Sequence, residues 1–239
     1  MIQFQKILQK TTLVAATVAC IIALVPTGSA AAATATQIKE AQTIANKFGM
    51  QVGAADGVFG PKTARGFCMF RYISGLTPSR AGLDTALLSK LRAYNTRYSS
   101  LRAIPSPAGT YLVAHEKCQM MVYATGGKYR AVTPISTGMS GFGTPNGTYA
   151  LGGTLRGWSC STLYPESCRT QSVGRFAYIS NYGNMYNKRH IVGGVKLHGS
   201  TSVPTYPASH GCIRVPVSFS DWMYDNVNAN IPIKIVGAY

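Results

Sequence analysis

The sequence predicts an α+β protein, with a small three-helix N-terminal module followed by a mostly β domain that carries one short helix. Apolar residues recur at helical spacing from Ile38 to Phe48, which is typical of an amphipathic helix. From Tyr111 onward, short runs of alternating apolar and polar residues are bounded by Gly, Pro and Asn, which is typical of strands and turns. A stretch from Ser220 to Asn228 has helical character, with Ser220 as a plausible cap.

Residues 1–30 are expected to be a secretory signal peptide. Lys6 and Lys10 precede an apolar run from Leu13 to Val25, and small residues suited to cleavage follow it. An uncleaved anchor is the alternative and would be the only membrane contact, but it is disfavoured because the run is too short to span a bilayer comfortably. The prediction is an exported, extracytoplasmic protein.

The chain is strongly basic, with a formal net charge of +16 and only seven carboxylates. Such a charge attracts polyanions through its long-range field. Nucleic acid is not the expected partner, because the protein is exported, its Lys and Arg residues are scattered and no nucleic-acid-binding motif is present. Anionic polymers that carry carboxylates and phosphates are expected instead. A role for the charge in solubility alone is the alternative.

The helical module is expected to occupy residues 36–92. Gly49 ends the first helix, and a turn-rich stretch leads to Pro61, which suits the first turn of a second helix. A third helix is expected near Leu83 to Leu91. Residues 93–108 are interpreted as a linker, because Asn, Ser and two prolines interrupt regular structure there.

The β-rich domain is expected to occupy residues 109–239. Its first strands are YLVAH, QMMVYA and YRAVTPIS, and further strands are expected near 175–179, 194–198 and 231–236. An insertion from Trp158 to Tyr186 is a candidate lid or groove wall, because insertions of this kind lie on surface loops that carry function. His115 and His190 lie in no motif and are interpreted as structural.

Two segments carry the residue types of a reactive thiol: LHGS at residues 197–200 and ASHGCIRV at residues 208–215. A thiol attacks carbonyl groups as a thiolate, so Cys212 needs an imidazole to take its proton, and His198 at a strand end suits that role. Gly211 is expected to aim its own amide and that of Cys212 at one point, as an oxyanion hole requires. There are two alternatives. Cys212 could be half of a disulfide, or it could form a zinc site with His198 and His210, although no fourth ligand is evident.

The cysteine count agrees with a free Cys212. Of six cysteines, Cys20 lies in the signal peptide, and setting Cys212 aside leaves four that can pair completely in three ways. The short loop between Cys160 and Cys168 favours a bridge there. Cys68 and Cys118 would then join the two parts of the chain.

The HGS and SHGCIR segments, with STG at residues 136–138 and GTPNGTY at residues 143–149, resemble the L,D-transpeptidase (YkuD-type) family, whose catalytic domain is sandwich-like. The resemblance implies that Cys212 is the nucleophile, His198 the base, and the Gly199 carbonyl the group that orients the imidazole. It also implies oxyanion or substrate binding by these residues: Ser209, His210, Gly211 and Arg214. The ten-residue spacer before Ser209 is short for the family, and Arg214 stands where many members have Asn. Arg214 could instead pair with Asp221 or Asp225.

The function implied by this resemblance is an exported cysteine enzyme that cross-links the stem peptides of peptidoglycan through a thioester, in the cell wall or periplasm, without a metal or cofactor. An L,D-carboxypeptidase, or a non-catalytic protein that binds cell-wall polymers, are the alternatives. The helical module resembles the peptidoglycan-binding type 1 module through Asp56, Gly57, Phe59, Gly60 and Thr63. Its closing motif is altered at Phe70 and Arg71, so glycan binding by this module stays open.

Overall fold

The structure is a computed structural model that describes residues 32–154, 156–161 and 183–239. The predicted signal peptide, the strand expected near residues 175–179, Cys20 and Cys168 lie outside the described residues. The described residues all belong to one compact unit, which spans Ala32–Tyr239. None of the helices found in this part of the chain is long and apolar enough to cross a membrane.

Three α-helices form the N-terminal part: α1 (Ala35–Lys47), α2 (Pro61–Ile73) and α3 (Thr85–Arg97). Each begins where the sequence supplies a start signal. Thr34 and Gln37 form a capping box at α1, Pro61 occupies the first turn of α2, and the Asp84 side chain accepts the Leu87 amide at α3. The third helix continues to Arg97, well into the stretch interpreted as a linker, because the first proline after it is Pro105. A short 3-10 helix, η1 (Leu101–Ala103), follows.

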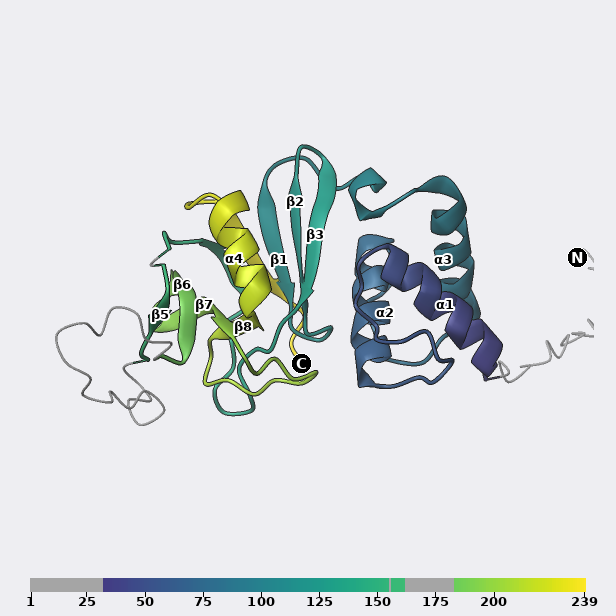
Figure 1. The fold of residues 1–239 in the computed structure, drawn as a ribbon, viewed down its shortest axis with the longest axis horizontal. Helices are drawn as coiled ribbons and strands as arrows, with labels where there is room; N and C mark the ends of the chain where they lie inside the picture. The colour runs from purple at the N-terminus through teal and green to yellow at the C-terminus, as the bar shows by residue number, and fades with distance from the viewer. Residues whose placement is uncertain (1–31, 155, 162–182) are drawn as a thin grey trace, which may run out of the picture. The chain divides into compact units, whose positions relative to one another are not determined.

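The remaining chain forms two sheets and one helix, consistent with the α+β class (Figure 1). The five-stranded sheet has the order β3-β2-β1-β9-β4, with β1 (Tyr111–His115), β2 (Met120–Thr125), β3 (Lys128–Pro134), β4 (Gly147–Ala150) and β9 (Pro232–Val236). The four-stranded sheet has the order β5-β6-β7-β8, with β5 (Trp158–Ser159), β6 (Met185–Val192), β7 (Val195–Ser200) and β8 (Ile213–Pro216). The helix after β8 is α4 (Val217–Asn226).

The strands β1 and β2 of the five-stranded sheet are buried on both faces, and this explains their apolar sequences. Val113 and Val122 belong to a core shared with the three helices, whereas Leu112 and Met121 belong to a second core shared with the other sheet and α4. Successive side chains of a strand point to opposite faces, so β1 contributes to both cores. In Figure 1 the strands β1–β3 accordingly stand between α4 and the helices α1–α3. The helical and β-rich segments therefore share one hydrophobic core.

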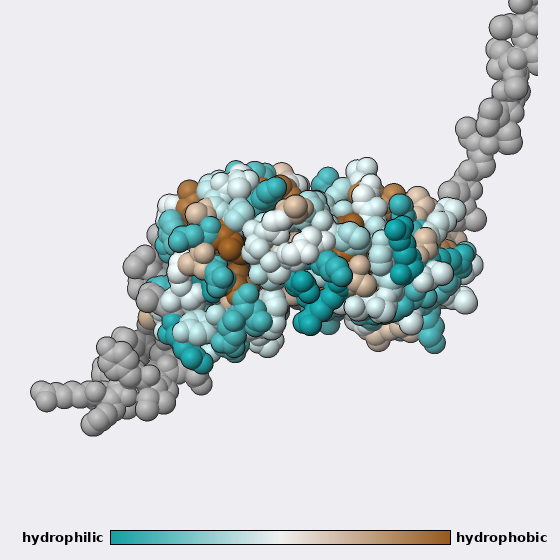
Figure 2. All heavy atoms as spheres, turned by 90° about the horizontal axis from the view of Figure 1, so that it is seen from above, coloured by the Kyte–Doolittle hydropathy of each residue, from teal (hydrophilic) through white to brown (hydrophobic). Residues whose placement is uncertain are grey.

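The disulfide between Cys68 in α2 and Cys118 in the β1–β2 turn is present, as predicted, and it joins the helices to the sheet. Cys160 also forms a disulfide. Cys168, the partner that the sequence favours for it, lies outside the described residues. Figure 2 shows hydrophilic residues spread over the visible face, with small apolar areas between them.

Two details of the β-rich domain differ from the prediction. The helix after Cys212 begins at Val217, with Pro216 at its N-cap, and Ser220 lies inside it with its hydroxyl donated to the Tyr186 carbonyl (3.2 Å). The expectation that Ser220 caps this helix was wrong, because Pro216 already supplies the backbone entry angle that starts it. The strands β4, β5, β6 and β8 were not predicted. In β6 the buried positions of the alternating pattern include two polar residues, Asn187 and Arg189, so the sequence lacks an apolar alternation there.

Candidate active site

The nucleophile candidate and the base candidate lie on neighbouring parallel strands. In the pairing of β7 with β8, Leu197 is opposite Ile213 and His198 is opposite Arg214. Leu197 and Ile213 both belong to the core between the sheets. Because side chains alternate along a strand, His198, Arg214 and Cys212, which immediately precedes β8, project from the opposite face. The strand pairing thus brings the imidazole and the thiol to the same side of one sheet.

A hydrogen bond to the neighbouring backbone defines the tautomer of His198. Its Nδ1 atom lies 3.0 Å from the carbonyl oxygen of Gly199, as the family resemblance implies. A carbonyl oxygen only accepts, so Nδ1 carries the proton and Nε2 keeps its lone pair. Burial, followed by the charge of Arg214, lowers the pKa of His198 to about 4 against the opposing effect of this hydrogen bond. The ring is therefore neutral at pH 7 and able to accept a proton.

Cys212 is a free, partly buried thiol. Burial raises the pKa of Cys212 above its ordinary value of 9.0, and this effect outweighs three that lower it. Those three are a hydrogen bond from the Lys196 amide to Sγ (3.4 Å), the charge of Lys196 and the charge of Arg214. The thiol is therefore protonated at rest, and the sulfur already has one backbone donor that would stabilise the thiolate.

The turn that presents Cys212 is closed by Ser209. Its hydroxyl is donated to the carbonyl of Cys212 (2.5 Å) and accepts the amide of Gly211 (3.2 Å). Gly211 has a φ of 109°, a conformation that favours glycine. The prediction that the amides of Gly211 and Cys212 converge on one oxyanion concerns the complex with substrate and stays a prediction. The Gly211 amide is engaged within the turn and would have to leave Ser209 to reach a substrate.

Thr144 is a buried residue of the site whose position the sequence did not reveal. Its hydroxyl accepts the Gly138 amide (2.9 Å) and is donated to the carbonyl of Gly211 (2.8 Å), next to the nucleophile. In the sequence, Thr144 belongs to the GTPNGTY segment, which is part of the family pattern. A threonine followed by proline in a loop was the available signal, but it does not specify the partner of the hydroxyl.

A second layer holds the loop that follows β3 against the nucleophile turn. The fully buried side chain of Gln119 donates to the Thr137 hydroxyl (2.7 Å) and accepts the Thr137 amide (3.0 Å). The Thr137 carbonyl in turn accepts the amides of Ala208 and Ser209, each at 3.0 Å. Neither contact was predicted, because Thr137 joins Gln119 to Ser209, and these two residues are 90 positions apart in the sequence.

The other predicted site residues flank this centre. The His210 ring packs edge-on against Phe142, with ring centroids 4.4 Å apart. The Arg214 backbone exchanges two hydrogen bonds with Ser136, at 3.0 and 2.9 Å. Among the described residues, Arg214 forms no ion pair with Asp221 or Asp225, so that alternative is wrong for this structure.

The side chains of His198, His210 and Cys212 bear on the zinc alternative. Within residues 32–154, 156–161 and 183–239, no group of three or more His, Cys, Asp or Glu side chains is arranged to hold a metal ion. His198, His210 and Cys212 therefore do not form a ligand set there. The arrangement that the structure does contain is a neutral imidazole and a protonated thiol on one face of a sheet, a pair suited to nucleophilic attack on a carbonyl.

The chain is similar to a known family of proteins. The family model of the L,D-transpeptidase catalytic domain, YkuD, matches residues 109–235. Among solved structures, an L,D-transpeptidase from Xylanimonas cellulosilytica is 22% identical, with a TM-score of 0.50, and the match covers 86% of this chain and 95% of that one. A Stackebrandtia nassauensis L,D-transpeptidase is 19% identical, with a TM-score of 0.48 and coverages of 86% and 93%.

The match to the family model includes both signature segments and more than half of the chain. A search of curated proteins gave no match. At 22% identity, the likeness to the Xylanimonas cellulosilytica structure concerns the fold alone. With the thiol and imidazole on paired strands of that fold, the chain belongs to the YkuD family of L,D-transpeptidase catalytic domains.

Proposed function

We propose that this protein is a peptidoglycan L,D-transpeptidase that forms cross-links between stem peptides through a thioester on Cys212. The observation that carries the proposal is the placement of a free thiol and a neutral imidazole on one face of paired strands. The hydrogen bond from Nδ1 of His198 to Gly199 leaves Nε2 to act as the base. Membership of the YkuD family supports the choice of substrate.

In the first half-reaction, His198 Nε2 removes the thiol proton and the sulfur attacks an amide carbonyl of a donor stem peptide, at its diaminoacyl residue. The carbonyl oxygen becomes an oxyanion in the tetrahedral intermediate, and the Cys212 amide is the donor best placed to hold it. When the C–N bond breaks, the imidazolium returns the proton to the nitrogen of the departing D-amino acid. The product is a thioester between the donor and Cys212.

In the second half-reaction, an amine of a neighbouring stem attacks the thioester. His198 takes a proton from the attacking nitrogen, the new amide bond forms, and the sulfur leaves and is protonated again. The 3-3 linkage expected for the product is what the family membership implies. Water in place of the amine would yield an L,D-carboxypeptidase from the same intermediate.

Intact-mass spectrometry of the protein with a carbapenem, whose strained cyclic amide acylates nucleophiles, tests the nucleophile. We expect one adduct on the wild type, none on Cys212→Ala, and strongly slowed formation on His198→Gln. Ser202→Ala, at an exposed position outside both signature segments, is the matched control and is expected to react normally. No adduct on the folded wild type would contradict the proposal and favour a non-catalytic wall-binding protein.

Muropeptide analysis distinguishes the two fates of the thioester. Incubation with tetrapeptide stems is expected to produce cross-linked dimers, whereas shortened monomers alone would identify a carboxypeptidase. Both products require Cys212, so Cys212→Ala is the control for each.

We further propose that the protein is exported with cleavage of residues 1–30, acts in the cell wall or periplasm, and is attracted to anionic cell-wall polymers. The supporting observations are the apolar N-terminal run and the net charge of +16. Identification of the N-terminal peptide of the exported protein is expected to find a start near residue 31. Sedimentation with cell walls is expected to weaken as salt rises through the physiological range, because salt screens surface charges.

A further inference from the structure

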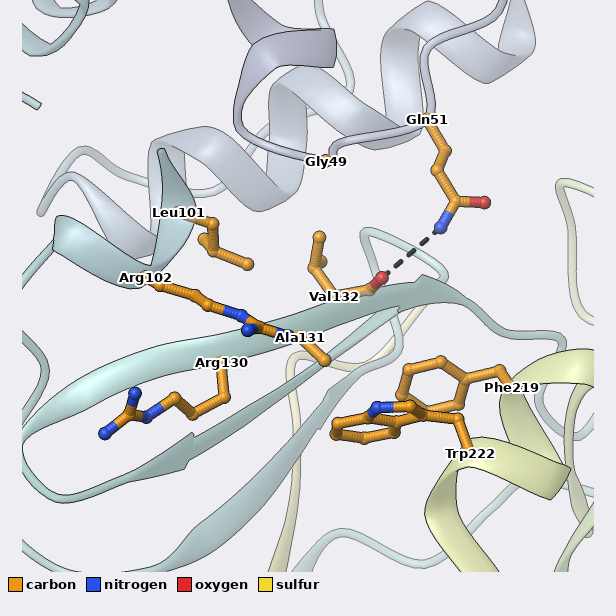
Figure 3. Close-up of a pocket in the computed structure, with 9 residues that line it drawn as sticks. All are labelled: Gly49, Gln51, Leu101, Arg102, Arg130, Ala131, Val132, Phe219 and Trp222. Carbon is orange, nitrogen blue, oxygen red and sulfur yellow. Dashed lines mark hydrogen bonds between the residues drawn. The ribbon is translucent and has the colours of Figure 1, made fainter. Parts of the chain in front are cut away.

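A pocket of about 330 Å³ lies away from the proposed active site, where the helices, the five-stranded sheet and α4 meet (Figure 3). Its volume falls within the range of small-molecule sites. Its lining residues come from four parts of the chain: Gly49, Gln51, Leu101, Arg102, Arg130, Ala131, Val132, Phe219 and Trp222. Neither His198 nor Cys212 contributes to it.

One wall of the pocket is aromatic. Phe219 and Trp222 lie one helical turn apart on α4, and their ring centroids are 5.2 Å apart with a tilt of 32°. Both side chains are only partly buried, so their rings border the pocket. The electron-rich face of an aromatic ring attracts the positively polarised C–H groups of a sugar ring, just as it attracts cations.

Another part of the lining carries positive charge. Arg102 is exposed, and Arg130 is partly buried with its Nε donated to the Thr125 carbonyl (3.2 Å), which orients its guanidinium. Within the described residues, neither arginine is paired with a carboxylate. In Figure 3 the two arginines lie on one side of Ala131 and the two aromatic rings on the other. A guanidinium binds a carboxylate through two parallel hydrogen bonds.

The floor of the pocket is β3, which is an edge strand of the five-stranded sheet. An extended peptide cannot pair with β3 at this place, because two backbone groups of the strand are already bonded. The Tyr129 amide is donated to the Ile104 carbonyl (3.3 Å), and the Val132 carbonyl accepts the side chain of Gln51 (3.3 Å). Only Arg130 and Ala131 are left between these contacts, too few for an extended peptide to pair with. These features disfavour a peptide and favour a compact ligand.

We propose that this pocket binds an acidic oligosaccharide, with one sugar ring against Trp222 and Phe219 and a carboxylate at Arg102 and Arg130. The inference rests on the proposed function, because a peptidoglycan strand exposes free lactyl carboxylates at muramic acid residues that have lost their stem peptides, beside residues that still carry them. Binding there would hold the protein on the polymer while Cys212 reacts with the attached peptides.

The chain has two tryptophans, so Trp158→Phe leaves Trp222 as the single tryptophan, and excitation at wavelengths that tryptophan alone absorbs makes it the reporter of the pocket. The probe is a peptide-free glycan of alternating N-acetylglucosamine and N-acetylmuramic acid, with a neutral N-acetylglucosamine oligomer of equal length as its control. We expect a saturable change in Trp222 emission with the acidic glycan. The neutral oligomer is expected to bind at least about tenfold more weakly, since it lacks a charge-assisted hydrogen bond.

In the same background, replacing Arg102 and Arg130 together by Ala is expected to weaken binding of the acidic glycan at least about tenfold. The double variant Lys39→Ala and Arg97→Ala changes the net charge equally on exposed helical positions and is expected to leave binding unchanged. No saturable signal, equal binding of the neutral oligomer, or an equal loss in the control variant would overturn the inference. Carbapenem acylation of the same proteins reports on Cys212 separately, so failure of the pocket and failure of the proposed function are distinguishable.

Discussion

Thr144 connects two backbone segments of the proposed active site through one hydroxyl group. Replacement by Val keeps the shape but leaves the Gly138 amide and the Gly211 carbonyl without their partner. We expect a loss of about 1–3 kcal/mol in the free energy of unfolding, because both groups are buried. Acylation by a carbapenem is expected to slow about tenfold, which corresponds to roughly 1.4 kcal/mol in the activation free energy.

Two variants separate positioning from stability at this residue. Thr144→Ser keeps the hydroxyl and is expected to restore the acylation rate even if it loses some packing. Thr148→Val changes an exposed threonine of β4 and is expected to have no effect on either measurement. Normal acylation by Thr144→Val would show that Thr144 does not position the nucleophile.

The pKa shifts of His198 and Cys212 predict how the thiol reacts with pH. The pKa of His198 is lowered to about 4 and that of Cys212 is raised above 9.0, so the resting pair is neutral between these values. Below the pKa of the thiol, the thiolate fraction rises tenfold for each pH unit. The rate of alkylation by iodoacetamide is therefore expected to rise steadily from pH 6 to pH 9. A plateau across this range would instead indicate a thiolate–imidazolium ion pair.

At the scale of elements, Asp84 links the start of α3 to α2. Its carboxylate accepts the Leu87 amide (2.8 Å) and pairs with Arg71 (2.8 Å), whose side chain is 6% exposed. Asp84→Ala is expected to lower the free energy of unfolding by about 1–3 kcal/mol, as measured by urea denaturation, because the cap and the partner of a buried cation are lost together. Asp84→Asn keeps a cap oxygen and is expected to cost less.

Asp225→Ala removes an exposed carboxylate on α4 and is the matched control for the change in charge. It is expected to leave the free energy of unfolding unchanged. The hydrogen bonds from Leu87 and Arg71 hold the pKa of Asp84 below its ordinary value, against the effect of burial. Because the folded-state pKa is lowered, this stabilisation is present at neutral pH and is lost as pH falls through the folded-state pKa. Equal stability of Asp84→Ala and Asp225→Ala would contradict the proposed link.

The elements differ in how well the sequence predicted them. The start of α2 at Pro61 and the strands β1–β3 were predicted, from the fixed φ of proline and from bounded apolar runs. The caps Thr34 and Asp84 were not predicted, although both use local capping chemistry. Ser220 was misassigned as a cap, because a serine inside a helix and one at its start have the same local signature until tertiary contacts choose between them. Strand β6 was not predicted, because polar residues, Asn187 and Arg189, occupy buried positions of its alternating pattern, and only tertiary contacts provide their partners.

At the scale of the molecule, the Cys68–Cys118 disulfide closes a segment of sequence separation 50 and joins the two parts of the shared core. Replacement of both cysteines by Ala is expected to lower the free energy of unfolding by about 2–4 kcal/mol, mainly because the unfolded chain gains freedom. Thermal unfolding checks this, with carbapenem acylation as the readout for the site. An unchanged melting temperature would contradict the expectation.

The sequence by itself determined the α+β class, the three N-terminal helices, the strands β1–β3, β7 and β9, and the choice of Cys212 and His198 as the candidate pair, because periodicity, turn residues and the two signature segments are local properties. Tertiary structure decided which hydroxyl and amide groups hold the nucleophile turn, and it engaged the Gly211 amide with Ser209. It also decided that the helices and the sheet share one core. The physical reason is that such contacts join residues far apart in the chain, and their geometry exists only when the strands are paired and the cores are packed.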